Sequence, residues 1–301
     1  MAATVRTPAP VPAPAPDPAP DWDSAALDLE RYLARVGLAR RSGTLVPDHH
    51  TLRAVHRAHV AAIPFENLEI VLGRPVPLDI ASLQRKLVDQ QRGGYCYEQN
   101  VLLAAALDRL GFRVEGFSAR IRVGDDRIRP TSHALLHVTD DDGAEWIADV
   151  GFGGGGLLEP IPFAPGTEMR QGRWTFRLDR VDAAGAAQWV LRSLHPDGPQ
   201  DMYAFTAQPQ YPVDYAVYNH YTSTHPRSPF TRGPMVQHTR PDLRRALRGT
   251  ALSETRPDEE PRTREVDPAD IPGILRDTFG IELDPADEAA VVHSAEQAAD
   301  Q

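Results

Sequence analysis

Residues 92–100 read Arg-Gly-Gly-Tyr-Cys-Tyr-Glu-Gln-Asn and contain Cys96, the only cysteine of the chain. The two glycines favour a turn, and the largely apolar run at residues 99–107 that follows is typical of a helix. Cys96 is therefore expected in the first helical turn, where free N–H groups and the helix dipole favour a thiolate over a thiol. A lone cysteine is more often a small buried apolar side chain, so the flanking sequence has to decide between that role and catalysis.

The composition is that of an ordinary globular protein. The chain has 301 residues, of which 25% are charged and 41% hydrophobic, and this length suffices for about two or three structural units. A formal net charge of −10 and the lack of a basic stripe argue against nucleic-acid binding. A single cysteine excludes an intrachain disulfide and agrees with a reducing compartment, so we expect a cytoplasmic protein.

Neither a membrane span nor a signal peptide is expected. No apolar stretch approaches the roughly 20 residues that a membrane-spanning helix needs. Residues 1–20 are rich in Ala and Pro and lack the apolar segment of a signal peptide, which predicts a disordered tail.

The sequence from residue 21 to residue 112 has the apolar spacing of helices. Four helices are expected, over residues 25–33, 51–60 and 83–90 and from Cys96 to about Gly111. The first should be capped by Asp23 or Ser24 and the third by Ser82. These residues therefore predict an N-terminal helical unit that carries the cysteine.

From residue 114 the pattern changes to the two-residue alternation of strands. Strands are expected over residues 114–123, 134–138, 145–150, 174–178 and 189–191. They predict a mainly antiparallel barrel or sandwich that ends near Tyr218. Beyond it, a polar connector at residues 255–261 should lead to a helix over residues 271–278, capped by Asp267 or Asp270, in a small α/β unit.

Two short strands around an acidic, glycine-containing loop predict a hairpin. A loop centred on Asp141 places His133 opposite Asp149 and His137 opposite Glu145, with Cβ atoms about 4.5–5.5 Å apart. The other face is then apolar, with Ala134 opposite Ala148 and Leu136 opposite Trp146. The pattern predicts a histidine oriented by a carboxylate, and it leaves open whether His133 or His137 is the one that matters.

Three motif matches are weak. The two histidines at 133 and 137 do not predict a metal site, because the segment is a strand and no Glu follows the first histidine. Residues 151–156 match Gly-x-Gly-x-x-Gly, but residues 157–162 cannot open a helix, so we expect a tight loop that a ligand can approach closely. The chain has no Gly-x-Ser-x-Gly motif, which disfavours a serine hydrolase of that type.

Five segments together resemble the arylamine N-acetyltransferase family, in the order in which the family has them. They read IPFENL at residues 63–68, RGGYCYE at 92–98, HALLHV at 133–138, DVGFGG at 149–154 and NHYTSTHPRSPF at 219–230. The resemblance implies an α+β fold of three domains. These would be an N-terminal helical bundle at residues 21–112, a central antiparallel β-barrel at 113–218, and a connector with a C-terminal α/β lid at 219–301.

The resemblance also implies an active site. Cys96 would be the nucleophile, His133 its base and Asp149 the orienting acid. Four aromatic residues would line the acceptor pocket: Phe65, Tyr97, Phe152 and Phe230. Five residues would lie near coenzyme A: Ser132, Gly153, Gly154, Tyr221 and Arg227. Arg92 and Glu66 are expected to form a structural ion pair, and His220 and His225 to lie in a solvated loop.

The implied reaction moves an acetyl group from acetyl-CoA, through a cysteine thioester, to the nitrogen of an arylamine or arylhydrazine. Acetyl-CoA would be a co-substrate, and no tightly bound cofactor is expected. Three alternatives stay open: an amide synthase of the same fold that closes a polyketide macrolactam from a carrier-bound chain, a cysteine hydrolase, and a non-catalytic binding module. A homodimer is a further expectation.

Overall fold

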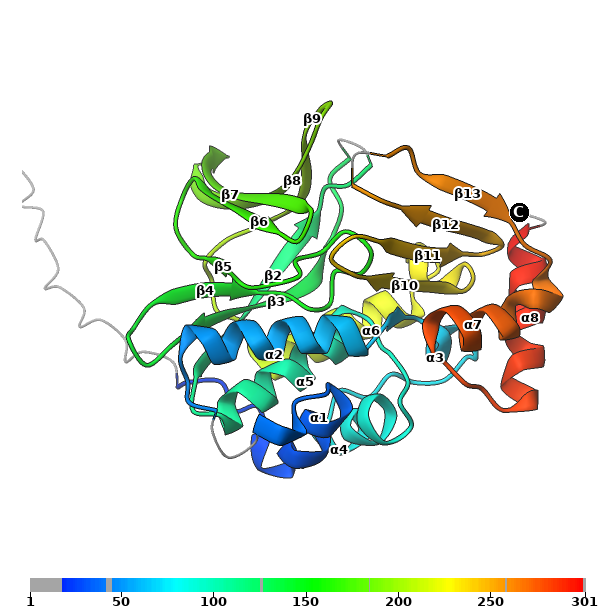
Figure 1. The fold of residues 1–301 in the computed structure, drawn as a ribbon, viewed down its shortest axis with the longest axis horizontal. Helices are drawn as coiled ribbons and strands as arrows, with labels where there is room; N and C mark the ends of the chain where they lie inside the picture. Colours follow the sequence, from blue (N-terminus) through cyan, green and yellow to red (C-terminus); the bar gives the residue numbers. More distant parts are fainter. Residues whose placement is uncertain (1–17, 42–44, 125–126, 184, 258, 300–301) are drawn as a thin grey trace, which may run out of the picture.

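The computed structural model describes residues 18–41, 45–124, 127–183, 185–257 and 259–299. Residues 1–17 of the expected Ala/Pro tail lie outside the described residues. Helices form one layer beneath two antiparallel sheets that lie side by side, and two further helices pack at the far end of the smaller sheet (Figure 1). This is the expected three-domain α+β architecture.

The N-terminal helices follow the expected order with different boundaries. They are α1 (Leu29–Arg35), α2 (His49–Ala62), α3 (Leu68–Val71), α4 (Ile80–Leu83), which continues as a π-helical run over Gln84–Asp89, and α5 (Cys96–Arg109). The predicted caps were wrong for the first and third helices. Asp28 caps α1 by accepting a hydrogen bond from the Arg31 N–H, and Asp79 caps α4 by accepting from the Ser82 N–H.

Helix α5 is the centre of the helical layer. Its residues from Cys96 to Leu107 are all buried, because it packs between the other helices and strand β3 (Thr131–Thr139). Burial of a leucine such as Leu102, Leu103 or Leu107 contributes about 1.5–3 kcal/mol of stability each. The residue at the start of α5 is therefore held by a rigid, closely packed element.

The larger sheet has eight strands in the order β5-β4-β3-β2-β9-β8-β7-β6. They are β2 (Arg113–Ile121), β3 (Thr131–Thr139), β4 (Glu145–Ala148), β5 (Ile161–Pro162), β6 (Thr167–Gln171), β7 (Trp174–Ala183), β8 (Ala186–His195) and β9 (Gly198–Phe205). The sheet curls until its two edge strands, β5 and β6, contact each other, which gives a nearly closed barrel. Its interior is filled by apolar and aromatic side chains such as Phe117, Leu135 and Phe176.

The β3–β4 hairpin has a different register from the predicted one. His137 lies opposite Ile147 instead of Glu145, a shift of two residues along β4. The cause is the loop: Gly143 adopts a left-handed conformation (φ 80°) and the Asp140 N–H donates to the Ala144 carbonyl, which closes three residues rather than a turn centred on Asp141. A shift of two leaves every side chain on its expected face, so His133 stays on the same side as Asp149.

Both faces of β3 are covered, whereas the sequence predicted one apolar face. Ala134 and Leu136 belong to the core around α5, and Leu135, on the face of the two histidines, is fully buried inside the barrel. His133 therefore lies in an interior environment rather than on a half-exposed sheet.

The C-terminal part contains more regular structure than the sequence predicted. Helix α6 (Pro212–Thr224) spans the expected boundary at Tyr218 and was not anticipated. Four strands follow it and, with β1 from the N-terminal part of the chain, form a five-stranded sheet in the order β1-β10-β11-β12-β13. The strands are β1 (Phe65–Glu66), β10 (Met235–Thr239), β11 (Arg244–Arg248), β12 (Ala251–Thr255) and β13 (Arg262–Glu265).

The predicted C-terminal helix is present as α7 (Ile271–Phe279), and α8 (Pro285–Ala299), which the sequence did not indicate, follows it. Asp267 caps the short turn before α7 by accepting from the Ala269 N–H, whereas the Asp270 side chain makes no capping hydrogen bond. The polar stretch at residues 255–261 joins β12 to β13 and does not lead directly into the helix.

Candidate active site

Cys96 is the first residue of α5 and is 3% exposed. The turn before it is fixed by Glu98, which accepts a hydrogen bond from the Tyr95 N–H (3.0 Å) at the helix start. The Cys96 Sγ lies 3.8 Å from the Ser132 carbonyl oxygen, so the thiol points at the strand that carries His133. The predicted placement of a thiol at a helix N-terminus is present in the structure.

His133 lies between Asp149 and Cys96. Its Nε2 is 2.7 Å from Asp149 Oδ2. The other ring nitrogen, Nδ1, is therefore available to the Cys96 side chain, which interacts with His133. Burial opposes a charged imidazole, but Asp149 and, more weakly, Cys96 raise the pKa of His133 to about 10. Burial likewise favours a neutral Asp149, yet His133 and two further hydrogen-bond donors lower the pKa of that carboxyl.

Asp149 is held by groups that the sequence did not single out. Asn100, one turn after Cys96 on α5, donates to Asp149 Oδ1 (3.1 Å) and accepts from the Val150 N–H (3.2 Å). The Gly151 N–H donates to the same carboxylate oxygen (2.9 Å). A polar Asn100 directly before the apolar run at residues 101–107 was the available signal, because a buried amide has to find hydrogen-bond partners.

Tyr203 on β9 is a second residue that sequence reasoning missed. Its ring centroid is 5.0 Å from that of His133 and 5.4 Å from that of Phe152. Burial, reinforced by Asp149, raises the pKa of Tyr203 well above its ordinary value, so the hydroxyl stays protonated. No strand was predicted over residues 198–205, and no local pattern pointed to this tyrosine.

The four predicted acceptor-pocket residues do not form one cluster. Phe65 and Phe230 lie together, with ring centroids 6.0 Å apart. Phe152 packs edge-on against His133 at 5.3 Å. Tyr97 is fully buried in the helical core. The Tyr95 ring lies between Tyr97 and Phe230, with its centroid 5.5 Å from each of the other two.

The residues predicted near coenzyme A fall into two groups. Ser132 precedes His133, and its carbonyl oxygen lies 3.8 Å from the Cys96 Sγ. Gly153 and Gly154 both lie against Gln237, and a Cβ on Gly153 would also stand 3.2 Å from the Phe65 ring. Tyr221 and Arg227 lie at the C-terminal end of α6. There the Tyr221 ring stacks on His225 (4.4 Å), and the Arg227 N–H donates to the His225 imidazole (3.1 Å).

The glycine loop at residues 151–156 rests on the smaller sheet. Gln237 on β10 accepts a hydrogen bond from the Gly154 N–H, and the Thr239 hydroxyl donates to the Gly153 carbonyl (3.1 Å). Gly153 has a left-handed backbone (φ 86°), and a Cβ there would meet Gln237 at 2.5 Å. The loop thus needs glycine for its conformation as well as for space.

Arg92 and Glu66 form the predicted ion pair below the cysteine turn. Arg92 Nη2 is 2.9 Å from Glu66 Oε1, and Arg92 also approaches Glu69 at 3.3 Å. Lys86, the only lysine, pairs with Glu98 at 2.7 Å and with Glu66 at 3.8 Å. These buried charges neutralise one another and anchor both ends of the turn that presents Cys96.

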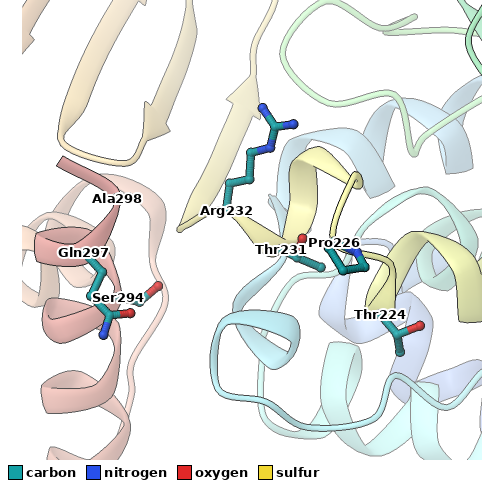
Figure 2. Close-up of a pocket in the computed structure, with 7 residues that line it drawn as sticks. All are labelled: Thr224, Pro226, Thr231, Arg232, Ser294, Gln297 and Ala298. Atoms are coloured by element: carbon teal, nitrogen blue, oxygen red, sulfur yellow. The ribbon is translucent and has the colours of Figure 1, made fainter. Parts of the chain in front are cut away.

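A cavity of about 410 Å³ lies apart from these groups, between α8 and the segment that follows α6 (Figure 2). It is lined by Thr224, Pro226, Thr231, Arg232, Ser294, Gln297 and Ala298. None of the predicted site residues belongs to this lining, so the contacts among Cys96, His133 and Asp149, and not cavity size, place the candidate active site.

Two further properties concern only the described residues. They contain no group of three or more His, Cys, Asp or Glu side chains that could hold a metal ion. In the same part of the chain, no helix has both the length and the apolar character needed to cross a bilayer.

Known proteins have a similar sequence and a similar fold. A family model described as N-acetyltransferase matches residues 48–289. The arylamine N-acetyltransferase of Mycolicibacterium smegmatis is 39% identical over 266 residues, covering 86% of this chain and 93% of its own. The crystal structure of the Nocardia farcinica arylamine N-acetyltransferase superposes with a TM-score of 0.86 at 47% identity, covering 92% of this chain and 97% of that one.

The Mycobacterium marinum arylamine N-acetyltransferase in complex with CoA is also similar, with a TM-score of 0.81 at 32% identity over 90% of this chain and 99% of that one. The chain therefore belongs to the arylamine N-acetyltransferase family and is an enzyme of that kind.

Proposed function

We propose that the enzyme transfers an acetyl group from acetyl-CoA to the nitrogen of an arylamine or arylhydrazine, with Cys96, His133 and Asp149 as a catalytic triad. The observation that carries the proposal is the position of His133, which hydrogen-bonds Asp149 at 2.7 Å and interacts with the Cys96 thiol through its other side. This is the nucleophile–base–orienter arrangement that activates a thiol.

In the first step, His133 takes the Cys96 proton and the thiolate attacks the acetyl carbonyl of acetyl-CoA. The bond from the carbonyl carbon to the CoA sulfur breaks, and the CoA thiolate leaves with the proton that His133 held. One thioester replaces another, so the step is nearly balanced in energy, and positioning contributes more than stabilisation of an oxyanion.

In the second step, the amine nitrogen attacks the acetyl-cysteine while His133 accepts a proton from that nitrogen. The carbon–sulfur bond breaks, and the Cys96 thiolate regenerates its ion pair with His133. Asp149 stays ionised throughout and keeps the imidazole oriented, in agreement with its lowered pKa.

The aromatic side chains around the triad suit a planar acceptor. Phe65, Phe230 and Phe152 would contact the arylamine ring, with Tyr97 supporting them from the core. On the coenzyme A side, the backbone of Ser132, Gly153 and Gly154 would lie along the pantetheine. Tyr221 and Arg227 would contact the more distant part of coenzyme A.

Steady-state kinetics with acetyl-CoA and aniline test the proposal. A covalent acetyl-enzyme predicts parallel double-reciprocal lines when both substrates are varied, and Cys96→Ser should remove the activity. Transfer only from a carrier-bound acyl chain would instead indicate the macrolactam-forming amide synthase. Rapid acetyl-CoA turnover without amine would indicate a hydrolase. A protein that reacts with none of the acyl donors would be a non-catalytic binding module.

Two further expectations belong to this proposal. A thiol nucleophile has to stay reduced, and the chain has one cysteine, which agrees with the cytoplasm as its location. The homodimer stays a prediction, to be tested by measuring the mass of the protein in solution.

A further inference from the structure

His56 on α2 is a fully buried histidine that the proposed reaction does not use. Its Nε2 accepts a hydrogen bond from the backbone N–H of Asp149 (3.1 Å), and its Nδ1 lies 3.2 Å from the Leu158 carbonyl oxygen. One side chain therefore connects the two ends of the loop at residues 149–158. That loop begins with Asp149, the carboxylate proposed to orient His133, and carries Phe152 and the glycines.

The two contacts select one form of the ring. The Asp149 N–H can only donate, so Nε2 has to be unprotonated; the Leu158 carbonyl can only accept, so Nδ1 has to carry the proton. Burial lowers the pKa of His56 to about 4, with smaller opposing effects from Leu158, Asp149 and Glu159, which keeps the ring neutral at working pH. A protonated ring would turn a donor towards the Asp149 N–H.

The far end of the loop is fixed to the same helix face. Arg53 and Arg57, which flank His56 on α2, both pair with the buried Glu159 carboxylate, at 2.5 and 3.0 Å. Gln171 on β6 accepts from the Leu158 and Glu159 N–H groups (2.8 and 3.0 Å). Helix α2 and strand β6 therefore both hold the Leu158–Glu159 end of the loop. His56 is the side chain that links this fixed end to the backbone of Asp149.

We infer that His56 is a positioning residue that fixes the Asp149 backbone, so that the carboxylate meets His133 in the geometry needed to hold the Cys96–His133 ion pair. The inference rests on the proposed function, because it assigns His56 a part in that same site. Without His56, the Asp149 N–H would be buried and unpaired, and the loop would be free to shift relative to β3.

Variants of His56 test the inference through the pH dependence of a single turnover. His56→Leu removes both hydrogen bonds, whereas the amide of His56→Gln can still accept from the Asp149 N–H. We expect His56→Leu to acetylate Cys96 about 10- to 100-fold more slowly, because small displacements of a catalytic group cost about that much. His56→Gln should remain within a few-fold of the wild-type rate.

The acetylation rate should fall at alkaline pH, and the pH of this fall (the alkaline limb of the pH–rate profile) is the readout that a purely structural role would not move. His133 has to be protonated to release CoA, so a looser Asp149 should shift this limb to lower pH by about one unit in His56→Leu. The charged and titratable groups around His56 and His133 are Asp149, Cys96, Glu159, His59 and Tyr203, together with Arg53 and Arg57, which pair with Glu159. The limb should keep its position in His56→Gln and in the control His137→Gln, a buried histidine on the other part of β3.

A wild-type rate and limb in folded His56→Leu would overturn the inference. If that variant does not fold, nitrogen-15 NMR of the wild-type histidines gives a second test, in which a proton on His56 Nε2 would contradict the assignment. The NMR test needs no activity, and absence of acetyl transfer in the wild type would count against the proposed function alone.

Discussion

Gly151 lies directly against the nucleophile: a Cβ atom on Gly151 would stand 2.6 Å from the Cys96 Cα and 2.9 Å from the Cys96 carbonyl oxygen. Such distances force backbone to move, because no flexible side-chain end can give way. The loop that follows Asp149 and the first turn of α5 are thus fitted to each other at van der Waals contact.

Gly151→Ala is therefore expected to lower both stability and activity. Overpacking of a closely packed interior typically costs about 1–3 kcal/mol, and displacement of Cys96 should slow acetylation at least tenfold. Gly273→Ala on α7 is the matched control, since its nearest neighbour would lie 3.7 Å away at a side-chain end. Urea unfolding and acetylation rates measure both effects, and a Gly151→Ala enzyme with unchanged values would contradict the close contact.

The ion pair of His133 with Asp149 should make stability depend on pH. The pKa of His133 is raised from 6.5 to about 10, so the stabilisation is complete below about pH 6 and is lost as the pH rises towards about 10. The lowered pKa of Asp149 adds stability that is lost only as the pH falls through its folded value. The difference in unfolding free energy between wild type and Asp149→Asn should consequently shrink between about pH 6 and about pH 10.

Asp140→Asn is the control for that measurement. The Asp140 carboxylate accepts from the Ala144 N–H and from the Trp146 indole N–H, neither of which titrates in this range. Its effect on the unfolding free energy should stay constant over the same pH interval. If the effect of Asp149→Asn on the unfolding free energy is equally independent of pH, His133 is not charged in the folded protein.

His137 is expected to be structural. It lies 3.1 Å from Glu115 and 3.2 Å from Glu145, and its ring stacks on Phe117 inside the barrel (5.2 Å). His137→Gln should cost about 1–3 kcal/mol of stability through lost hydrogen bonds while leaving the acetylation rate within a few-fold. His133→Gln should abolish acetylation, and a comparable loss in His137→Gln would show that the assignment of the two histidines is wrong.

The Arg92–Glu66 pair should matter for folding rather than for chemistry. Arg92→Met leaves the fully buried Glu66 carboxylate short of its closest cation, which typically costs about 3–5 kcal/mol. The double variant with Glu66→Gln should recover part of this loss, because the uncompensated charge is gone. Arg31→Met, at an exposed pair with Asp89, should cost at most about 1 kcal/mol. An equal loss in the single and double variants would contradict this account.

The parts of the fold that were predicted correctly have local signals. Helix α5 follows from two glycines and a continuous helix-forming run, and the pairing of His133 with Asp149 follows from a two-residue alternation around an acidic loop. The register was wrong because it depends on the backbone of Gly143, and a shift of two residues leaves the alternation of the two faces unchanged.

The missed parts depend on long-range contacts. His56 is 93 residues from Asp149 in the sequence, and Tyr203 reaches the site from a strand whose residues do not alternate clearly. Strands β10 to β13 are short and largely polar, and β13 is exposed throughout, so only their pairing reveals them. Helix α6 has little apolar periodicity because its buried side chains include Asn219 and Thr222.

Intact-mass spectrometry of the enzyme mixed with acetyl-CoA in the absence of amine tests the central claim most directly. The account predicts a single added acetyl group, located on the peptide that contains Cys96, which disappears when aniline is added and does not form in Cys96→Ala. An acetyl group that still forms in Cys96→Ala, or transfer to aniline by that variant, would contradict the role of Cys96.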